Sequence, residues 1–363
     1  MKNCQLCGSD SLKTILEFKR TPIFQNKVYS TEDEARKAVT GDIVLVQCMS
    51  CGFVFNKEFN EALMQYDVRY QNEQAHSDYF QSYVEEIIEL LKSKDLLSGK
   101  IVEIGCGKGY FLNRLLQEGV DAIGFDPAYE GKNPRIIKDY FSDTYQEVDA
   151  DAIILRHTLE HIQQPLIFLQ SVAKSNGYRG KIFVEVPCFD WIRNKNAFWD
   201  IYYEHCNYFS MDTLRSMFTA SIAGRYFRDQ YLYLIADLSD LKMKVIPDRQ
   251  SILLVDDFFL QEFDRYKQFL RKNKDIMVWG AGAKGVTFVN LLDPERVFIQ
   301  GLIDINPKKK GRYIAKTAHK IYGSDVLRFK NVKTVLIMNE NYLEEIMKMV
   351  GEPGIEFHTL GVI

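Results

Sequence analysis

The chain has 363 residues, of which 46% are hydrophobic and 26% charged, and its 46 basic and 49 acidic side chains give a net charge of −3. This composition indicates a globular protein of two or three domains and excludes a strong positive field toward nucleic acid or an anionic membrane. The sequence shows no apolar signal segment and no apolar run of membrane-spanning length. We therefore expect a cytoplasmic protein without nucleic-acid or membrane partners.

Two cysteine pairs mark the N-terminal region. Cys4 and Cys7 form one CxxCG pattern, and Cys48 and Cys51 form a second. The two-residue spacer lets both sulfurs of a pair face one ion, and the following glycine permits a tight turn. Four thiolates would complete a closed tetrahedral zinc site with no position for a reacting water. We predict a structural zinc module over residues 1–65, with free buried thiols or a redox pair as the alternatives.

A polar, tyrosine-rich stretch follows the second cysteine pair. It contains Tyr66 and Tyr70 and precedes a helix predicted over residues 77–97, whose apolar residues repeat every three to four positions. Such a helix packs one face on a sheet, so the stretch before it is expected to cover a ligand entrance. The two tyrosines and His76 would bind substrate hydroxyls or carbonyls. The alternative is that the tyrosines are half-buried, with satisfied hydroxyls.

The chain is organised around a short apolar run, Ile101–Ile104, that predicts a buried parallel strand. Three alternate glycines follow it, and a helix is expected to begin near Tyr110; the glycines are Gly105, Gly107 and Gly109. Glycines in such a loop let the backbone approach a ligand closely, and the helix N-terminus offers unpaired N–H donors.

Two acidic residues accompany this loop. Glu103 lies at the strand end and can orient an amine-bearing ligand group, while Asp126 ends the next apolar run and can accept both hydroxyls of a ribose. The pattern Glu-x-Gly-x-Gly-x-Gly followed by this aspartate resembles the cofactor site of class I S-adenosylmethionine-dependent methyltransferases. A dinucleotide site, or a tight turn that binds nothing, is the alternative.

Further strand-like runs follow in the order expected for that family. They include residues 135–139, 152–155 and 181–187, with a loop and helix between the last two. This order resembles the methyltransferase sheet through its fifth strand. The resemblance implies that Asp139 lies near the adenine and that the segment from Arg156 and His157 to His161 lines the cofactor mouth. We assign residues 66–238 to this domain.

The segment Trp199–Ser210, just after the fifth predicted strand, contains several titratable side chains close together in sequence. It contains Tyr202, Glu204 and His205, and ligands of this fold meet at the carboxyl ends of the strands. Imidazole suits proton abstraction near neutral pH, an adjacent carboxylate can raise its basicity, and a tyrosine can polarise a carbonyl. The alternative is a buried histidine bonded to backbone among core aromatics.

The cysteine pairs, the tyrosine stretch, the glycine loop and the segments around His161 and His205, in this order, resemble zinc-containing sugar C-methyltransferases of deoxysugar biosynthesis. The resemblance covers the whole chain. It implies methylation of a nucleotide-linked 4-keto sugar at carbon 3 through an enolate. It implies these roles: His205 as the base, Glu204 as its partner, Tyr202 and His161 at the sugar or enolate oxygen, and Tyr66 or Tyr70 opposite.

The C-terminal region, residues 239–363, contains a predicted amphipathic helix over 255–273 and a second strand, glycine loop and helix. The loop has Gly280, Gly282 and Gly285, and Asp304 ends the next run. This spacing is typical of dinucleotide sites and raises a nicotinamide-dependent oxidoreductase as an alternative. About four strands are expected, which is few for a full dinucleotide fold. In the family it resembles, this domain helps to hold the nucleotide sugar, with Lys284 a candidate for the pyrophosphate.

We therefore predict an α/β protein with a class I methyltransferase sheet, an N-terminal zinc module and a smaller C-terminal Rossmann-like domain. The expected cofactors are S-adenosylmethionine and structural zinc, and the expected partner is a nucleotide-linked sugar. An O- or N-methyltransferase, a nicotinamide enzyme and a catalytically silent scaffold are the alternatives. The sequence leaves open whether the protein is a monomer or a homo-oligomer.

Overall fold

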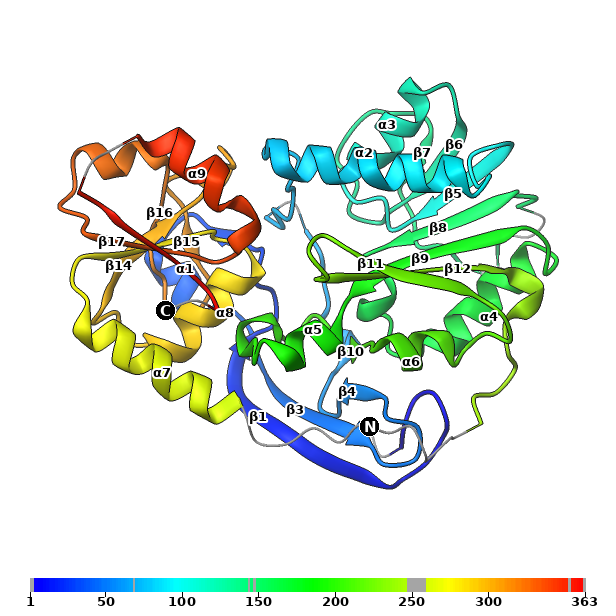
Figure 1. The fold of residues 1–363 in the computed structure, drawn as a ribbon, viewed down its shortest axis with the longest axis horizontal. Helices are drawn as coiled ribbons and strands as arrows, with labels where there is room; N and C mark the ends of the chain where they lie inside the picture. The colour runs from blue at the N-terminus through cyan, green and yellow to red at the C-terminus, as the bar shows by residue number, and fades with distance from the viewer. Residues whose placement is uncertain are drawn as a thin grey trace.

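The computed structural model describes residues 3–67, 69–142, 144–145, 148–246, 259–351 and 354–361. Within these ranges the chain forms sheets of four, seven and five strands and one two-stranded ribbon. Figure 1 shows the seven-stranded sheet in the central domain, the five-stranded sheet in the C-terminal domain beside it, and the N-terminal strands along the lower side of both.

The central sheet has the strand order β11-β12-β9-β8-β5-β6-β7. Five neighbouring strands, from β9 to β7, are parallel, and β12 runs antiparallel to both β9 and β11. The strands are β5 (Lys100–Ile104), β6 (Asp121–Phe125), β7 (Ile136–Ile137), β8 (Ala152–Arg156), β9 (Lys181–Pro187), β11 (Ile222–Tyr226) and β12 (Tyr231–Asp237). The strands predicted from the apolar runs are therefore present, and they pair in parallel as expected.

Helices cover both faces of this sheet, as Figure 1 shows. On one face lie α2 (Asp78–Ser93) and α3 (Tyr110–Gln117), and on the other lie α4 (Pro165–Ser175), α5 (Phe189–Asn194) and α6 (Met211–Arg215). Parallel strands are buried on both faces, which is why β8 is a continuous apolar run apart from its last residue. This three-layer arrangement confirms the predicted fold class.

Helix α2 shows how the sequence sets one of these layers. The hydroxyl of Ser77 accepts a hydrogen bond from the Phe80 amide and caps the helix. The buried face repeats at helical spacing and consists of Tyr83, Val84, Ile87, Ile88 and Leu91. The helix ends at Ser93 rather than at residue 97, because Asp95 adopts a left-handed backbone with φ 55°.

The N-terminal strands do not form an isolated module. The four-stranded sheet has the order β1-β3-β4-β10, so that β10 (Asn207–Tyr208) of the central chain segment completes it. Its other strands are β1 (Leu12–Pro22), β3 (Thr40–Cys48) and β4 (Val54–Asn56). A short helix, α1 (Glu32–Arg36), and β2 (Val28–Tyr29) lie in the excursion between β1 and β3, and β2 pairs with β15 (Tyr313–Ile314) of the C-terminal domain.

The C-terminal domain is built on a parallel sheet of order β16-β14-β13-β17-β18. Its strands are β13 (Ile276–Trp279), β14 (Ile299–Ile303), β16 (Ile321–Tyr322), β17 (Thr334–Ile337) and β18 (Glu356–Thr359), and its helices are α7 (Phe259–Lys272), α8 (Ala283–Leu292) and α9 (Leu343–Val350). The four expected strands are confirmed, and the two-residue β16 adds a fifth.

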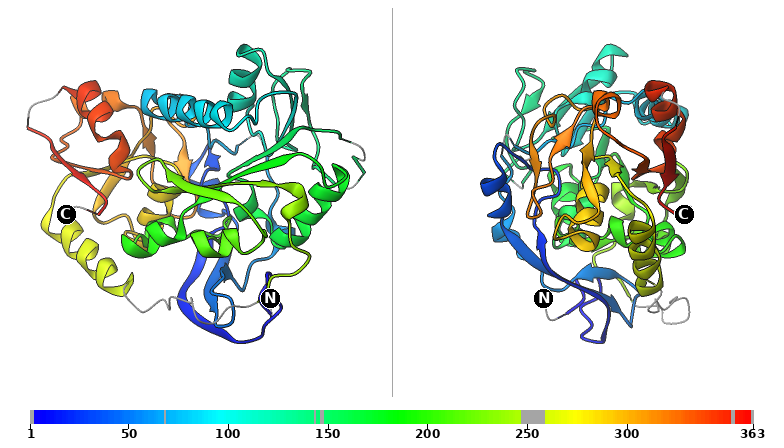
Figure 2. Two further views of the ribbon diagram at one scale, coloured as in Figure 1. Left: turned by 45° about the vertical axis from the view of Figure 1, so that its right-hand side comes forward. Right: turned by 90° about the vertical axis from the view of Figure 1, so that its left-hand side faces the viewer.

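Helix α7 connects the C-terminal domain to the central domain. Tyr266 and Leu270 are fully buried on its inner face, and the Tyr266 ring lies 5.3 Å from that of Trp199. The part of the predicted helix at residues 255–258 lies outside the described residues. The C-terminal end of the chain packs on the same helix, because the Gly361 amide donates to the Tyr266 hydroxyl at 2.7 Å, and Figure 2 shows the two side by side from two directions.

The domain boundaries at 65/66 and 238/239 stay predictions, and strand pairings cross both of them. β10 joins the N-terminal sheet, and β15 joins β2. In the described part of the chain, no helix has the length and apolar character that a membrane crossing requires.

Candidate active site

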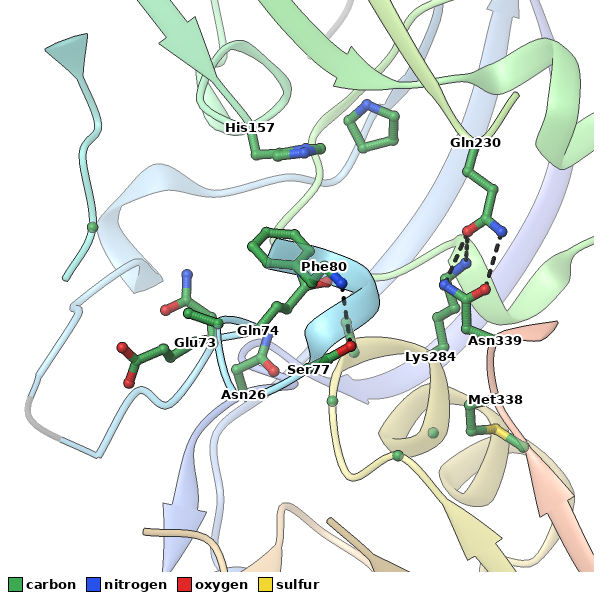
Figure 3. Close-up of a pocket in the computed structure, with 18 of the residues that line it drawn as sticks. Asn26, Glu73, Gln74, Ser77, Phe80, His157, Gln230, Lys284, Met338 and Asn339 are labelled. Carbon is green, nitrogen blue, oxygen red and sulfur yellow. Dashed lines mark hydrogen bonds between the residues drawn. The ribbon is translucent and has the colours of Figure 1, made fainter. Parts of the chain in front are cut away.

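A single cavity of about 410 Å³ is lined by residues of the central and C-terminal domains and of the N-terminal segment. Both glycine loops open into it: Gly105 and Gly107 from the central domain, and Gly280, Gly282 and Gly285 from the C-terminal domain. Figure 3 shows part of this lining, with Glu73, Gln74 and Ser77 on one side and Gln230, Lys284 and Asn339 on the other. Two ligands held by two different loops can therefore meet in one chamber.

The first glycine loop has a backbone that only glycine adopts without strain. Gly105 and Gly107 have φ values of 80° and 57°. A Cβ at Gly105 would lie 2.2 Å from the hydroxyl oxygen of Thr158, whereas a Cβ at Gly107 would meet nothing within 4 Å. Gly105 is therefore required for packing, and the backbone at Gly107 is open toward the cavity.

Glu103 lies beneath this loop with an unpaired carboxylate oxygen. The residue is 2% exposed, and its Oε2 has no hydrogen-bond partner among the described residues. Burial raises the pKa of Glu103 to about 7; Arg156 opposes this shift and Asp126 adds to it. A buried carboxylate without a partner is costly, so Glu103 is suited to a ligand that brings a positive group into the cavity.

The two other predicted acids lie outside the lining of the cavity. Asp126 accepts hydrogen bonds from the amides of Gly107 at 2.9 Å and Ala128 at 2.8 Å, and so fixes the loop. Asp139 is exposed, and its carboxylate accepts from the Tyr145 hydroxyl at 2.7 Å. Gly109 caps α3 and is likewise absent from the described lining. A cofactor role for these three residues stays a prediction.

Arg156 and His157, both expected at the cofactor mouth, line the cavity. The Arg156 guanidinium donates to Glu185 at 2.7 Å and lies 4.4 Å from the centre of the Phe111 ring. Burial lowers the pKa of Arg156 to about 10, partly offset by the charge of Glu103. His157 has a left-handed backbone with φ 49°, a conformation that costs a few kcal/mol at most and concentrates at functional sites.

His205 faces the cavity from the segment after the 3-10 helix Phe198–Asp200. It is 7% exposed, and its ring centre lies 4.2 Å from that of Tyr202 and 4.7 Å from that of His161. Burial, followed by repulsion from His161 and His157, lowers the pKa of His205 well below its ordinary value. The imidazole is therefore neutral at physiological pH and can accept a proton.

The expected partnership between Glu204 and His205 stays a prediction, and the Glu204 carboxylate forms its hydrogen bonds with other residues. The two carboxylate oxygens of Glu204 accept hydrogen bonds from the Tyr70 hydroxyl at 2.6 Å and from the Gln25 amide at 3.1 Å. The carboxylate near His205 is instead that of Glu160, whose Oε1 lies 4.0 Å from Nε2. Neighbours in sequence can point to different partners when the chain between them turns, as it does here.

Sequence reasoning placed Glu160 within the segment at the cofactor mouth but gave it no role of its own. It lies in the 3-10 helix Leu159–His161 directly before His161, and its side chain lines the cavity. The adjacent His161 was predicted, and its Nδ1 lies 2.8 Å from the carbonyl oxygen of Glu204, which accepts a hydrogen bond from it. The sequence around His161 indicated a site, but a three-residue helix has no periodicity from which to predict which side chain points into the cavity.

The predicted tyrosines separate into two layers. Tyr70 and Tyr202 line the cavity, whereas Tyr66 is not among its described lining residues. The Tyr66 ring packs edge-on against Tyr70 at 5.0 Å and against Phe24 at 4.9 Å. Burial raises the pKa of all three hydroxyls well above the ordinary value, so each remains protonated and able to donate a hydrogen bond.

The second glycine loop again lies between a strand and a helix, but of its three glycines only Gly280 has a positive φ, at 115°, and cations lie beside it. The Asp304 carboxylate accepts from the Ala281 amide at 3.0 Å, as Asp126 does from Gly107, but the buried Lys309 ammonium lies 3.3 Å from Asp304. Lys284, at the start of α8, donates to the side-chain carbonyl of Gln230 at 2.8 Å, as Figure 3 shows. The C-terminal side of the cavity therefore carries positive groups.

Lys284 also pairs with the buried Asp200 of the central domain at 3.1 Å. Burial raises the pKa of Asp200, and Lys284 opposes that shift. We expect Lys284→Met to destabilise the protein by about 3 kcal/mol near neutral pH, because it leaves a buried carboxylate unpaired. The unfolded chains of the two proteins titrate alike at Asp200, so the loss should appear only as the pH rises through the raised pKa of Asp200 in the folded parent protein.

Urea unfolding of Lys284→Met at pH 8 and at pH 4 measures this effect. Asp200→Asn in the same chain removes the buried charge and should restore most of the stability at pH 8. Equal unfolding midpoints for Lys284→Met and the parent protein at pH 8 would show that the ion pair contributes nothing.

The four predicted metal ligands come together at the N-terminal sheet. Sγ of Cys4 lies 3.6 Å from that of Cys51, and Sγ of Cys7 lies 3.6 Å from that of Cys48. Zn–S bonds of about 2.3 Å in a tetrahedron give S–S separations of about 3.8 Å, which these distances approach. Gly8 and Gly52, both at φ 77°, form the expected tight turns. The cluster is compatible with zinc.

Comparison with known proteins matches both large domains. Residues 73–221 match the family model described as a methyltransferase domain, and residues 260–355 match the C-methyltransferase C-terminal domain. The C-methyltransferase NovU of Streptomyces niveus is 26% identical over 231 residues, which is 59% of this chain and 54% of that protein. The match thus spans about half the length of that relative.

Solved structures of methyltransferases match part of the chain. An S-adenosylmethionine-dependent methyltransferase from Archaeoglobus fulgidus covers 44% of this chain and 99% of its own, at 18% identity and a TM-score of 0.33. The plantazolicin methyltransferase BpumL, solved in complex with SAH, covers 45% and 85%, at 13% identity and a TM-score of 0.36. The two domain matches and the similarity to NovU support methyltransferase activity.

Proposed function

We propose that the protein is an S-adenosylmethionine-dependent C-methyltransferase that acts at carbon 3 of a nucleotide-linked 4-keto deoxysugar. The observation that carries this proposal is the neutral, buried imidazole of His205 in the same cavity as the open glycine loop. Carbon acids ionise reluctantly, so C-methylation needs a placed base, whereas many other methyl transfers need alignment alone. The match to a C-methyltransferase C-terminal domain supports the same chemistry.

The residues of the first loop fit the proposed cofactor. Glu103 offers an unpaired carboxylate for the ammonium group of a methionine moiety, and the backbone at Gly107 leaves room for close approach. Arg156 and His157 border the same space, and we keep Asp126 as the proposed ribose partner. When bound, S-adenosylmethionine supplies a methyl group on a positively charged sulfur, which needs no activation by an acid.

His205 would take the proton from carbon 3, so that the C–H electrons move into the ketone as an enolate. Donors aimed at a developing oxyanion are worth about 3 kcal/mol each. The Tyr202 hydroxyl and the imidazole of His161 lie beside His205 and are the proposed donors, with Tyr70 across the cavity. The enolate carbon then accepts the methyl group, and the C–S bond breaks.

The C-terminal side of the cavity supports an anionic substrate. Lys284 and Lys309 lie there with the backbone of Gly280 and Gly282, and this set suits the diphosphate of a nucleotide sugar. The family match of residues 260–355 favours this role over a nicotinamide site. We propose that the four cysteines bind a structural zinc ion that takes no part in the reaction.

Product analysis tests the proposed function. The protein would be incubated with S-adenosylmethionine that carries a 13C-methyl group. The candidate acceptors would be 4-keto-6-deoxyhexoses, each linked to a nucleoside diphosphate, with every common nucleobase represented. We expect one of them to gain a methyl group whose carbon couples to sugar carbon 3 in the NMR spectrum of a 13C-labelled sugar. Methyl transfer to oxygen or nitrogen, or no transfer to any of them, would contradict the proposal.

The pKa of Glu103 predicts how cofactor binding depends on pH. Because its pKa is raised to about 7, the free protein carries a neutral Glu103 below that pH, and the ammonium group of the ligand then loses its partner. We expect the affinity for S-adenosylhomocysteine to fall about tenfold for each pH unit below 7. Calorimetry from pH 5.5 to 8 measures it. Glu103→Gln should bind weakly with a flat profile, and an unchanged slope in that variant would exclude Glu103 as the source.

A further inference from the structure

We propose that Glu160 is the positioning residue that stabilises His205 when it becomes positively charged. This inference rests on the proposed function, because it assigns a role in the step in which His205 takes a proton from carbon. The role of charge partner had been expected of Glu204, which is held by Tyr70 and Gln25 instead.

The burial of Glu160 calls for a partner that the resting structure does not supply. The residue is 1% exposed, and neither carboxylate oxygen accepts a hydrogen bond from any residue in the described ranges. Buried polar groups are normally hydrogen-bonded, and an unsatisfied one usually marks stored strain or a functional role. A carboxylate that is unpaired before the reaction gains its partner when a neighbouring group becomes a cation.

Two imidazoles lie near the same oxygen of Glu160. Oε1 is 4.0 Å from Nε2 of His205 and 3.5 Å from Nδ1 of His157. The other nitrogen of His157 lies 3.6 Å from Glu185 Oε2, so His157 sits between two carboxylates. Its left-handed backbone holds it there. His157 thus faces both Glu160 and Glu185, whereas His205 has Glu160 as its nearest carboxylate among the ion pairs described.

Apart from Glu160, none of the described side chains around His205 favours its protonation, and His161 and His157 lower its pKa. His161 and His157 approach it from the segment after β8, Tyr202 from its own segment, and Tyr208 from β10 with ring centres 6.4 Å apart. None of these four side chains brings a negative charge to His205. Glu160 therefore supplies the negative charge that an imidazolium needs. Catalytic contacts are often long in a structure without substrate and shorten in the reacting complex, so a 4.0 Å separation suits this role.

The proton balance of the step is simple. The C–H bond at carbon 3 breaks, its electron pair becomes the enolate, and the proton binds a ring nitrogen of His205. The imidazolium is then stabilised by the Glu160 carboxylate, and no oxidant or metal takes part. Removing the charge of Glu160 should therefore weaken His205 as a base without removing it.

Glu160→Gln tests this role, because it keeps the shape of the side chain and removes its charge. The assay uses the nucleotide-linked 4-keto sugar that the wild type methylates. We expect kcat to fall about 100-fold, with KM changed less than threefold. In the plot of kcat against pH, we expect the acidic limb to move to lower pH. The limb should move because the imidazolium loses its stabilising charge. Glu204→Gln is the matched control, and it should leave the position of that limb unchanged.

The outcomes separate this inference from the proposed function. If no 4-keto sugar is methylated by the wild type, the proposed function fails first. If the wild type methylates one and Glu160→Gln keeps both kcat and the acidic limb, only the role of Glu160 is overturned. A second metal ion per chain, lost in Glu160→Gln, would also overturn it, because the carboxylate would then be a ligand.

A second variant covers the case in which Glu160→Gln does not fold, as judged by lost near-UV circular dichroism. Glu160→Asp keeps the charge on a side chain one methylene shorter. We expect its kcat to fall at least about threefold, with the acidic limb shifted in the same direction as for Glu160→Gln. An unmoved limb in Glu160→Asp, together with reduced kcat, would show that Glu160 acts only on the structure.

Discussion

His205→Ala is expected to lower the rate of methyl transfer by about 10²-fold to 10⁴-fold, which is the contribution of a placed general base. The effect should fall on kcat, because the imidazole acts on the bond that breaks rather than on binding. His205 is buried at the cavity wall and its pKa is lowered, so its imidazole has a lone pair available for a proton. Single-turnover methylation by quenched flow measures the change.

Binding separates this effect from a loss of structure. His205→Ala should bind S-adenosylhomocysteine within threefold of the wild type, since the loop of Gly105 and Gly107 is untouched. His358→Ala is the matched control: this histidine lies on β18, where its ring contacts Phe269 at 5.0 Å, and the variant should retain wild-type methylation. Methylation by His205→Ala within tenfold of the wild type would exclude it as the base.

Removal of the metal from the cysteine cluster is expected to unfold the N-terminal sheet. Binding of zinc to structural sites contributes about 10 to 16 kcal/mol in isolated peptides, more than the whole stability of a typical domain. The loss should spread to the active site, because β4 pairs with β10 and the Asn56 amide donates to the Cys206 carbonyl, next to His205. We expect Cys48→Ser to lose both the metal and most methylation.

Metal analysis and hydrogen exchange measure this prediction. The wild type should contain one zinc per chain and Cys48→Ser less than a tenth of that, with faster amide exchange in β1 and β3 and unchanged exchange in β13 and β17. Cys106→Ser, at a buried cysteine outside the cluster, should keep its zinc. Full zinc content in Cys48→Ser, or slow exchange in its β1 and β3, would contradict a structural zinc site.

The local elements could be predicted because their signals are local. The strand and loop of Ile104 to Gly109 followed from an apolar run and alternate glycines, and β5 and α3 lie where expected. The cysteine spacing likewise predicted four sulfurs in one place. In each case the physical cause, whether burial, backbone freedom or ligand geometry, acts over a few residues.

The features that the sequence did not predict depend on contacts between distant segments. The pairing of β10 with β4 and of β15 with β2 brings the three regions of the chain around one cavity. β2, β10 and β15 have two residues each, so no periodicity in the sequence predicts these pairings. The same limit explains why the sequence did not show which of the two carboxylates, Glu204 or Glu160, lies near His205. Both flank a predicted histidine, and only the folded chain shows which carboxylate meets Tyr70 and which meets His205.

The two glycine loops show a further limit. Both predict a strand, a turn and a helix, and in both the acid after the second strand accepts a loop amide. What distinguishes them is the surroundings: an unpaired Glu103 at the first, and the buried Lys309 ammonium at the second. Glu103 belongs to the first motif, so that motif indicated its ligand, whereas Lys309 follows the next strand of the second unit, so the second glycine pattern alone could not assign a ligand.

The most direct test of the account is hydrogen exchange at carbon 3 of the sugar substrate in deuterated water, with S-adenosylhomocysteine in place of the methyl donor. The account predicts that the wild type replaces this hydrogen with deuterium, as followed by proton NMR, and that His205→Ala does so at least about 100-fold more slowly. A substrate that the enzyme methylates but whose carbon-bound hydrogen never exchanges, or exchanges equally fast with His205→Ala, would contradict it.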